Sequence, residues 1–160
     1  MTLEPEGLST LQLFPLSAAI GTELRKRRIV RTANLAGCYA ERLFSEAFGW
    51  TLERNSKSGY DAIDQGVRYQ IKCRRPTSQN KSRQLGEFSK FSERRFDKLA
   101  AIIFNEDYSI KRAVIMDYDD VARLSKVVLE RQRLVLDDWI CGEPTVLDVT
   151  TEVSDAQARL

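Results

Sequence analysis

The feature that most constrains the fold is a pair of alternating segments joined by a short turn. Residues 60–64 and 67–74 alternate polar and apolar side chains, and Gln65-Gly66 between them suits a tight hairpin turn. With a two-residue turn, Asp61 lies directly opposite Gln70, and opposed residues project to the same side of the sheet. The sequence therefore predicts an antiparallel hairpin whose two faces differ in chemistry.

One face of this hairpin is polar and the other is apolar, because successive side chains of a strand point to opposite sides. Asp61, Gln70 and Lys72 share the polar face. The other face carries the apolar side chains of Tyr60, Ala62, Val67, Tyr69, Ile71 and Cys73. A three-residue turn would exchange Asp61 with Asp64. We favour the two-residue turn because it keeps the apolar residues together, and it makes Asp64 a turn residue.

Hydrophobic periodicity and turn residues predict a mixed order of helices and strands along the rest of the chain. We expect helices at residues 17–30, 32–48, 88–98 and 119–129, and strands at 50–54, 60–64, 67–74, 99–104 and 110–116. Residues 55–59 suit a turn, and 134–139 and 145–150 suit short strands or loops. This order predicts an α/β (α+β) domain, with helices on the faces of a mixed central sheet.

The length of 160 residues fits one domain with a substantial core. Within it, residues 1–30 are expected to form an N-terminal arm and helix, with residues 1–15 as the arm. Residues 117–160 are expected to form a C-terminal extension.

The composition excludes several kinds of chemistry. The chain has no histidine, which rules out Ser-His-Asp and Cys-His catalysis and histidine-ligated zinc. Its three cysteines, Cys38, Cys73 and Cys141, are widely spaced, which favours small core residues over a disulfide framework or a thiolate metal site. No apolar run is long enough to span a membrane or resembles a secretory signal, so we expect a cytoplasmic protein.

Positive charge is concentrated in the middle of the chain, although the net charge is only +2. Residues 68–98 carry ten basic and three acidic side chains, whereas residues 99–160 carry seven and twelve. A solvated loop is the simpler explanation of the basic segment on charge alone. Contact with a polyanion is the alternative if the basic side chains share one face.

The polar face of the hairpin has the groups that a phosphodiesterase needs. A carboxylate and an amide oxygen, Asp61 and Gln70, suit a hard cation such as Mg²⁺, which takes oxygen ligands and keeps several waters. Lys72 could then donate to a phosphate oxygen or to the attacking water. The alternative is a solvent-facing strand with an Asp61–Lys72 ion pair and a bystander glutamine.

The order of these residues resembles the PD-(D/E)XK, or restriction endonuclease-like, nuclease superfamily. A glutamate in an N-terminal helix (Glu41) is followed by the G-Y-D triplet ending in Asp61 and by Q-I-K, which begins with Gln70 and ends with Lys72. The resemblance covers residues 35–116 and implies a restriction endonuclease-like core of αβββαβ order. Its implied activity is metal-dependent hydrolysis of phosphodiester bonds in DNA by an endonuclease that uses Mg²⁺ or Mn²⁺.

The resemblance also implies a role for each residue. Asp61 becomes a metal ligand, Gln70 takes the position of the second acidic residue, Lys72 is the motif lysine, and Glu41 completes the metal site. The departure from the motif is Gln70, because a neutral amide attracts a cation less strongly than a carboxylate does. One site per chain favours a homodimer for double-strand cleavage.

The basic segment acquires a role from this resemblance, as a phosphate-binding wall of a DNA cleft. The candidate residues are Arg74, Arg75, Lys81, Arg83, Lys90, Arg94 and Arg95. Phe88, Phe91 and Phe96, which alternate with these charges, are expected to be a buried stripe of an amphipathic helix rather than a base-stacking platform. Two other functions stay open: a catalytically inactive nucleic-acid-binding module on the same scaffold, and a subunit that binds a partner through its acidic C-terminal part.

Overall fold

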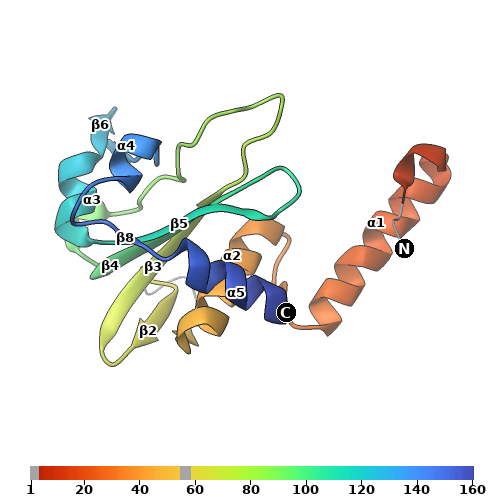
Figure 1. The fold of residues 1–160 in the computed structure, drawn as a ribbon, viewed down its shortest axis with the longest axis horizontal. Helices are drawn as coiled ribbons and strands as arrows, with labels where there is room; N and C mark the ends of the chain where they lie inside the picture. Colours follow the sequence, from red (N-terminus) through yellow and green to blue (C-terminus); the bar gives the residue numbers. More distant parts are fainter. Residues whose placement is uncertain (1–3, 55–58) are drawn as a thin grey trace.

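A computed structural model describes residues 4–54 and 59–160. Its centre is a six-stranded mixed sheet in the order β1-β2-β3-β4-β5-β8, with helices packed on it (Figure 1). The predicted α/β (α+β) class is confirmed. The strands are β1 (Thr51–Leu52), β2 (Ala62–Asp64), β3 (Val67–Arg74), β4 (Lys98–Phe104), β5 (Ile110–Asp117) and β8 (Leu147–Asp148).

The hairpin has the predicted two-residue turn. Asp64 pairs with Val67 and Ala62 pairs with Tyr69. Gln65 and Gly66 both have positive φ angles, 47° and 82°, which is the geometry of the turns that suit the twist of a hairpin. The turn predicted at 55–59 lies outside the described residues, except for Gly59.

Strand β4 forms the centre of the core. It runs parallel to β3 and antiparallel to β5, and all of its residues after Lys98 are buried. Leu99, Ala101 and Ile103 face one apolar cluster, whereas Ala100, Ile102 and Phe104 face another. A continuous apolar run predicts such a strand, because both of its faces are covered.

Two helices cover the second of these faces. Helix α2 (Leu35–Phe48) begins at Asn34, whose side chain accepts a 3.0 Å hydrogen bond from the Gly37 amide, and ends at Gly49 in the left-handed conformation. Helix α5 (Thr150–Arg159) packs beside it and contributes the buried Val153. Periodicity indicated α2 nearly to its bounds, but it did not indicate α5. The short strand or loop expected at 145–150 is confirmed, since this segment contains β8.

The opposite face is covered by a long irregular crossover, residues 75–97, instead of the helix predicted at 88–98. A 3₁₀ turn, η3 (Phe91–Glu93), is the helical part of this region. Two backbone carbonyls within the segment predicted to be helical accept hydrogen bonds from side chains of other elements. The Tyr118 hydroxyl donates to the Phe91 carbonyl at 2.6 Å, and an Arg68 side-chain nitrogen donates to the Arg94 carbonyl at 3.1 Å.

The phenylalanines of the crossover are nevertheless buried, as expected. Phe88 and Phe96 are 7 % and 4 % exposed, and Phe91 packs partly buried against the same cluster. Their spacing therefore indicated burial correctly and the local conformation wrongly. The αβββαβ order of the expected core lacks its second helix here, since β3 leads to β4 through the irregular crossover.

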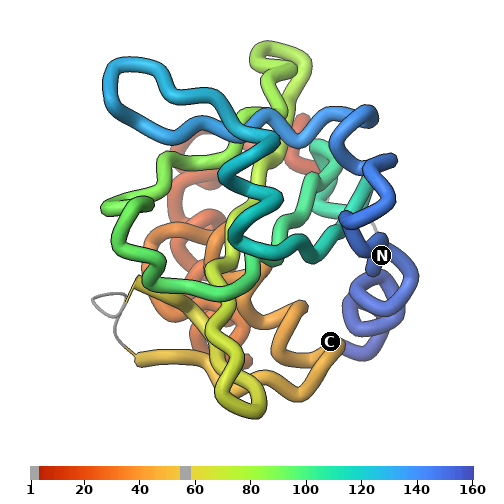
Figure 2. The backbone as a smooth tube through the Cα atoms, turned by 90° about the vertical axis from the view of Figure 1, so that its left-hand side faces the viewer, coloured from red at the N-terminus to blue at the C-terminus, as the bar shows by residue number. Residues whose placement is uncertain are grey.

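The C-terminal part completes this face with short elements. Helix α3 (Tyr118–Leu124) ends earlier than the predicted 119–129, because Lys126–Val128 (β6) and Arg131–Arg133 (β7) form a separate hairpin. A short helix, α4 (Asp138–Cys141), follows. Figure 2 shows the β6-β7 hairpin and the crossover on the same side of the molecule, where Arg131 pairs with Glu87 at 2.9 Å.

Helix α1 (Thr10–Lys26) leads away from these layers (Figure 1). It begins within the predicted arm, because Ser9 and Gln12 form a capping box, and Pro15 lies inside it. A short 3₁₀ helix, η1 (Pro5–Gly7), precedes it. Within the described ranges, no helix is both long enough and apolar enough to cross a bilayer.

Candidate active site

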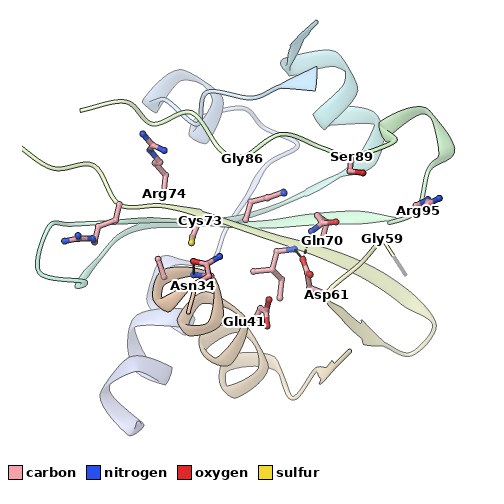
Figure 3. A pocket seen from close by; sticks show the side chains of 15 residues that line it. Asn34, Glu41, Gly59, Asp61, Gln70, Cys73, Arg74, Gly86, Ser89 and Arg95 are labelled. Atoms are coloured by element: carbon pink, nitrogen blue, oxygen red, sulfur yellow. Dashed lines mark hydrogen bonds between the residues drawn. The ribbon is translucent and has the colours of Figure 1, made fainter. Parts of the chain in front are cut away.

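The four residues singled out in the sequence, Glu41, Asp61, Gln70 and Lys72, line one polar cleft of about 580 Å³. The cleft lies at the edge of β3 beyond the point where its pairing with β2 stops. The first turns of α2 form one wall and the crossover forms the other (Figure 3). A strand edge with unpaired backbone groups and charged walls is a place where polar ligands can bind.

Asp61 occupies the point where β2 and β3 separate. Its backbone N–H still donates to the Tyr69 carbonyl at 2.8 Å. Its carboxylate then replaces the next strand partner, since Oδ2 accepts the Ile71 amide at 2.7 Å and also the side-chain amide of Gln70. The carboxylate is therefore fixed by the backbone of β3, and the predicted contact between Asp61 and Gln70 is present.

Glu41 projects from α2 toward Asp61 (Figure 3) and is 20 % exposed at the side chain. The guanidinium of Arg31 pairs with its carboxylate and donates a second hydrogen bond to the Glu53 carbonyl at 3.0 Å. Arg31 thereby links the segment before α2 to the segment after β1. Glu41 is thus held in place by a cation that the sequence analysis did not single out.

Lys72 reaches toward the opposite wall of the cleft. Its ammonium donates to the Glu87 carbonyl at 3.0 Å and lies 5.5 Å from the centre of the Phe88 ring. Because Glu87 also pairs with Arg131, the crossover and the β6-β7 hairpin are connected to the position of this lysine.

Burial shifts the pKa of Asp61, Glu41 and Lys72 toward the neutral form of each side chain. Burial raises the pKa of Asp61, and its hydrogen bond from Ile71 and the charge of Lys72 oppose the rise. Burial also raises the pKa of Glu41; Arg31 opposes this, and the charge of Asp61 adds to it. Burial lowers the pKa of Lys72 against the pull of Asp61. Ionisable groups whose pKa values are shifted by burial and by neighbouring charges are typical of functional sites.

Cys73 lies beside these groups but is not a reactive thiol. Burial and the charge of Glu41 raise its pKa to about 11, with Lys72 opposing the rise. Cysteine nucleophiles need a lowered pKa, because the thiolate is the reactive form. Cys38 and Cys141 are buried, as expected of small core residues.

Three of the seven predicted phosphate-binding residues line the cleft: Arg74, Arg75 and Arg95. Arg74 donates to the Ser82 carbonyl at 3.1 Å. Arg95 packs over Gly59, where a Cβ atom would come within 2.4 Å of the Arg95 side chain and the backbone has a φ of +82°. The glycine of the G-Y-D triplet therefore makes room for a basic side chain at the rim.

The other four basic residues do not line the cleft. Arg83 turns away to pair with Asp138 at 2.7 Å and is only 16 % exposed. Arg94 lies over the Tyr118 ring, 4.4 Å from its centre, and also pairs with Asp119. Lys81 and Lys90 are exposed on the crossover.

The structure adds residues to the cleft that sequence reasoning missed. These are Asn34 and Gly37 at the start of α2, and Gly86 and Ser89 of the crossover. Arg31, which was also missed, lines a neighbouring pocket and pairs with Glu41 from there. The start of α2 brings backbone N–H groups and the positive end of the helix dipole toward the cleft. Asn34 could have been found as a cap three residues before Gly37, but nothing in the sequence places it opposite Ser89.

The donors in the cleft fit a hard divalent cation with few protein ligands. Within residues 4–54 and 59–160, no three side chains among Asp, Glu, Cys and His converge on one point. Glu41 and Asp61 are two mutually repelling, partly buried carboxylates, and Gln70 offers an amide oxygen while its nitrogen bonds Asp61. Two carboxylates and an amide oxygen match Mg²⁺, which binds through few carboxylates and keeps waters.

Comparisons with known proteins leave these observations to stand by themselves: no protein-family model matches the chain, and no curated protein is significantly similar to it.

Proposed function

We propose that this protein is a divalent-cation-dependent nuclease of the restriction endonuclease-like type that hydrolyses phosphodiester bonds in DNA. The observation that carries the proposal is the convergence of Glu41, Asp61, Gln70 and Lys72 in one cleft, in the order and on the elements that the resemblance implies.

Each residue has a distinct task in this proposal. Glu41, Asp61 and Gln70 would hold Mg²⁺ or Mn²⁺, which lowers the pKa of a bound water and offsets charge on the phosphate. The Lys72 ammonium donates a hydrogen bond to the attacking or phosphate oxygen, and its position over Phe88 keeps it beside the crossover. Because burial disfavours the negative charge of Glu41 and Asp61, a bound divalent cation would stabilise both carboxylates.

The walls of the cleft supply the affinity for the nucleic-acid backbone. Arg74 and Arg95 line it on the side of the crossover, and the positive end of α2 lines it on the other side. Contacts of this type recognise phosphates and do not distinguish one base sequence from another. We therefore expect binding that weakens with salt and tolerates many sequences.

The test is cleavage of supercoiled plasmid with Mg²⁺, with Mn²⁺ and with a chelator. Wild-type protein should nick or linearise the plasmid only with a divalent cation, and Lys72→Ala should remove this activity by about 10³-fold. Lys111→Ala is the matched control, because it removes the same charge from an exposed position of β5. Equal cleavage by the Lys72→Ala and wild-type proteins would refute the assigned mechanism.

One observation favours a second function, a nucleic-acid-binding module without catalysis. The carboxylates already have protein partners, since Arg31 pairs with Glu41 and the Gln70 amide donates to Asp61. These partners compete with a cation for the same oxygens. A metal titration followed by melting temperature separates the functions, because bound metal stabilises the folded state. DNA binding with neither a thermal response nor cleavage would support the module.

A further inference from the structure

Helix α1 exposes an apolar surface for which the rest of the described chain provides no cover. Thr10–Lys26 contains no buried residue, and Leu11 and Phe14 are 87 % and 76 % exposed. An isolated helix of this length is marginal in water, because most helix stability in proteins comes from packing. A helix in this condition is expected to pack against another surface.

The two halves of α1 differ in chemistry. The first half is apolar around most of its circumference, with Leu11, Leu13, Phe14 and Leu16 among residues 11–16. Helices that are apolar on several sides are usually enclosed rather than laid on a flat surface. At about 100° per residue, Leu13 and Leu16 share one side, while Leu11 and Phe14 project from another.

An apolar groove of about 420 Å³ lies at the other end of α1, where the helix joins the body. One wall is the second half of α1 itself, through Ile20 and Leu24. The other wall comes from α2, α5 and the turn before β5, and includes Leu35, Tyr39, Tyr108 and Leu160. Leu35 and Leu160 are 42 % and 38 % exposed, so this groove also lacks a complete cover.

Charge determines which occupant fits the groove. Residues 4–20 carry two acidic side chains, Glu4 and Glu6, and no basic one, whereas residues 25–28 are four consecutive basic residues. Arg27 lies at the groove itself. The apolar first half of α1, together with the two acidic residues that precede the helix, is therefore complementary to an apolar groove with a basic rim.

We propose that two copies of this chain pair through antiparallel α1 helices, with the first half of each helix seated in the groove of the other copy. In this arrangement Leu13 and Leu16 of one copy contact Ile20 and Leu24 of the other. Leu11 and Phe14 face Leu35 and Leu160, and Glu4 and Glu6 approach Arg27 and Arg28. The contact is isologous, as in most soluble dimers, and each groove is filled once.

The dipoles of the two helices favour the same orientation. Antiparallel helices place the negative end of one beside the positive end of the other. A parallel pair would instead place four basic residues against four basic residues. The proposal does not depend on the chemistry of the cleft, so each can fail without the other.

The test is the mass of the full chain in solution, measured by sedimentation equilibrium between about 1 and 100 µM, the range of ordinary protein association. Wild-type protein should reach twice the 18.3 kDa chain mass. Leu11→Asp with Phe14→Asp should raise the dimer dissociation constant by about 100-fold or more, because charge would enter the groove. Ala19→Asp, an exposed change on the same helix, is the control and should leave the mass unchanged.

Charge reversal distinguishes the antiparallel pair from other arrangements. Glu4→Arg with Glu6→Arg should weaken the dimer, and so should Arg27→Glu with Arg28→Glu. All four changes together should restore it, because each end again meets its opposite. In a parallel pair the basic ends face each other, so Arg27→Glu with Arg28→Glu would strengthen the dimer instead of weakening it.

Two results would overturn the proposal. The first is a wild-type chain that stays monomeric throughout the concentration range, including one whose α1 binds anionic lipid vesicles or DNA instead. The second is a dimer whose dissociation constant is unaffected by Leu11→Asp with Phe14→Asp, which would place the interface elsewhere. Circular dichroism of the variants verifies that the exposed substitutions leave the helix content unchanged.

Discussion

The cleft and helix α1 depart from ordinary packing in opposite ways. The cleft partly buries charged groups, whereas α1 exposes apolar ones. In the cleft, other groups of the chain offset the cost of burying charge: the Ile71 amide donates to Asp61, and the Arg31 guanidinium pairs with Glu41. At α1 the described chain offers no such compensation. This difference is the reason why we propose a small charged ligand for one site and a second copy of the chain, which adds apolar surface, for the other.

The largest expected effect tests the charged side of this comparison. Asp61→Asn keeps an oxygen that can accept the Ile71 amide but removes the negative charge. Divalent-dependent plasmid cleavage should fall by about 10³-fold or more, because the proposed metal ligand becomes neutral. A variant that cleaves at the wild-type rate would show that the buried charge at this position serves no catalytic purpose.

The same substitution should make the protein more stable at neutral pH. Burial raises the folded-state pKa of Asp61 above its unfolded value, so the associated stability is complete below the unfolded value and is lost as pH rises through the folded one. Asn has no such loss, and we expect the variant to melt about 2–4 °C higher at pH 7. The gap should close below about pH 4, where the wild-type carboxyl is protonated too. Thermal melts across pH check the sign; a variant that melts lower at pH 7 contradicts it.

An effect smaller than the expected loss of cleavage comes from the partner of Glu41. Arg31→Ala removes the ion pair and the hydrogen bond to the Glu53 carbonyl, which leaves Glu41 partly buried without its cation. The variant should lose about 1–2 kcal/mol of unfolding free energy in urea titrations. Adding Glu41→Gln should recover part of that loss, since the uncompensated charge disappears. Additive losses would mean that the pair contributes no coupling.

The smallest effect is expected on the apolar side of the comparison. Phe14→Ser should change the melting temperature of the monomer, at concentrations below dimerisation, by less than about 1 °C, because its ring is already exposed to water. Phe44→Ala in α2 is the buried counterpart and should cost about 3–5 kcal/mol. A large effect of Phe14→Ser on the monomer would reveal packing of α1 against its own chain.

Local sequence patterns predicted the elements whose conformation depends on residues close together in the chain. The two-residue turn fixed the register of β2 and β3, and with it the contact between Asp61 and Gln70. The apolar run at 99–104 predicted the central strand, and α2 followed from its periodicity and from Gly49. These features depend on side chains close together in sequence.

The features that the sequence did not reveal depend on contacts between distant residues. The crossover is held in its irregular conformation by Tyr118 and Arg68, which hydrogen-bond to its carbonyls and are distant in sequence. Likewise, Arg83 belonged to the basic segment by position but pairs with Asp138, far along the chain. Arg31 was missed because its proximity to Glu41 requires the turn between α1 and α2.

The irregular crossover also affects how the protein assembles. Strands β3 and β4 are parallel neighbours, and Tyr69 pairs with Lys98 only after the whole crossover has closed on itself. Pairings between such distant residues form slowly, because the chain loses loop entropy before it gains contacts. The wall opposite α2 is part of that loop, so the cleft is complete only after the central sheet has formed. A partly folded chain would then expose the edge of β3 without the crossover that covers it. The rate at which the crossover closes would therefore influence the fraction of the protein that folds completely.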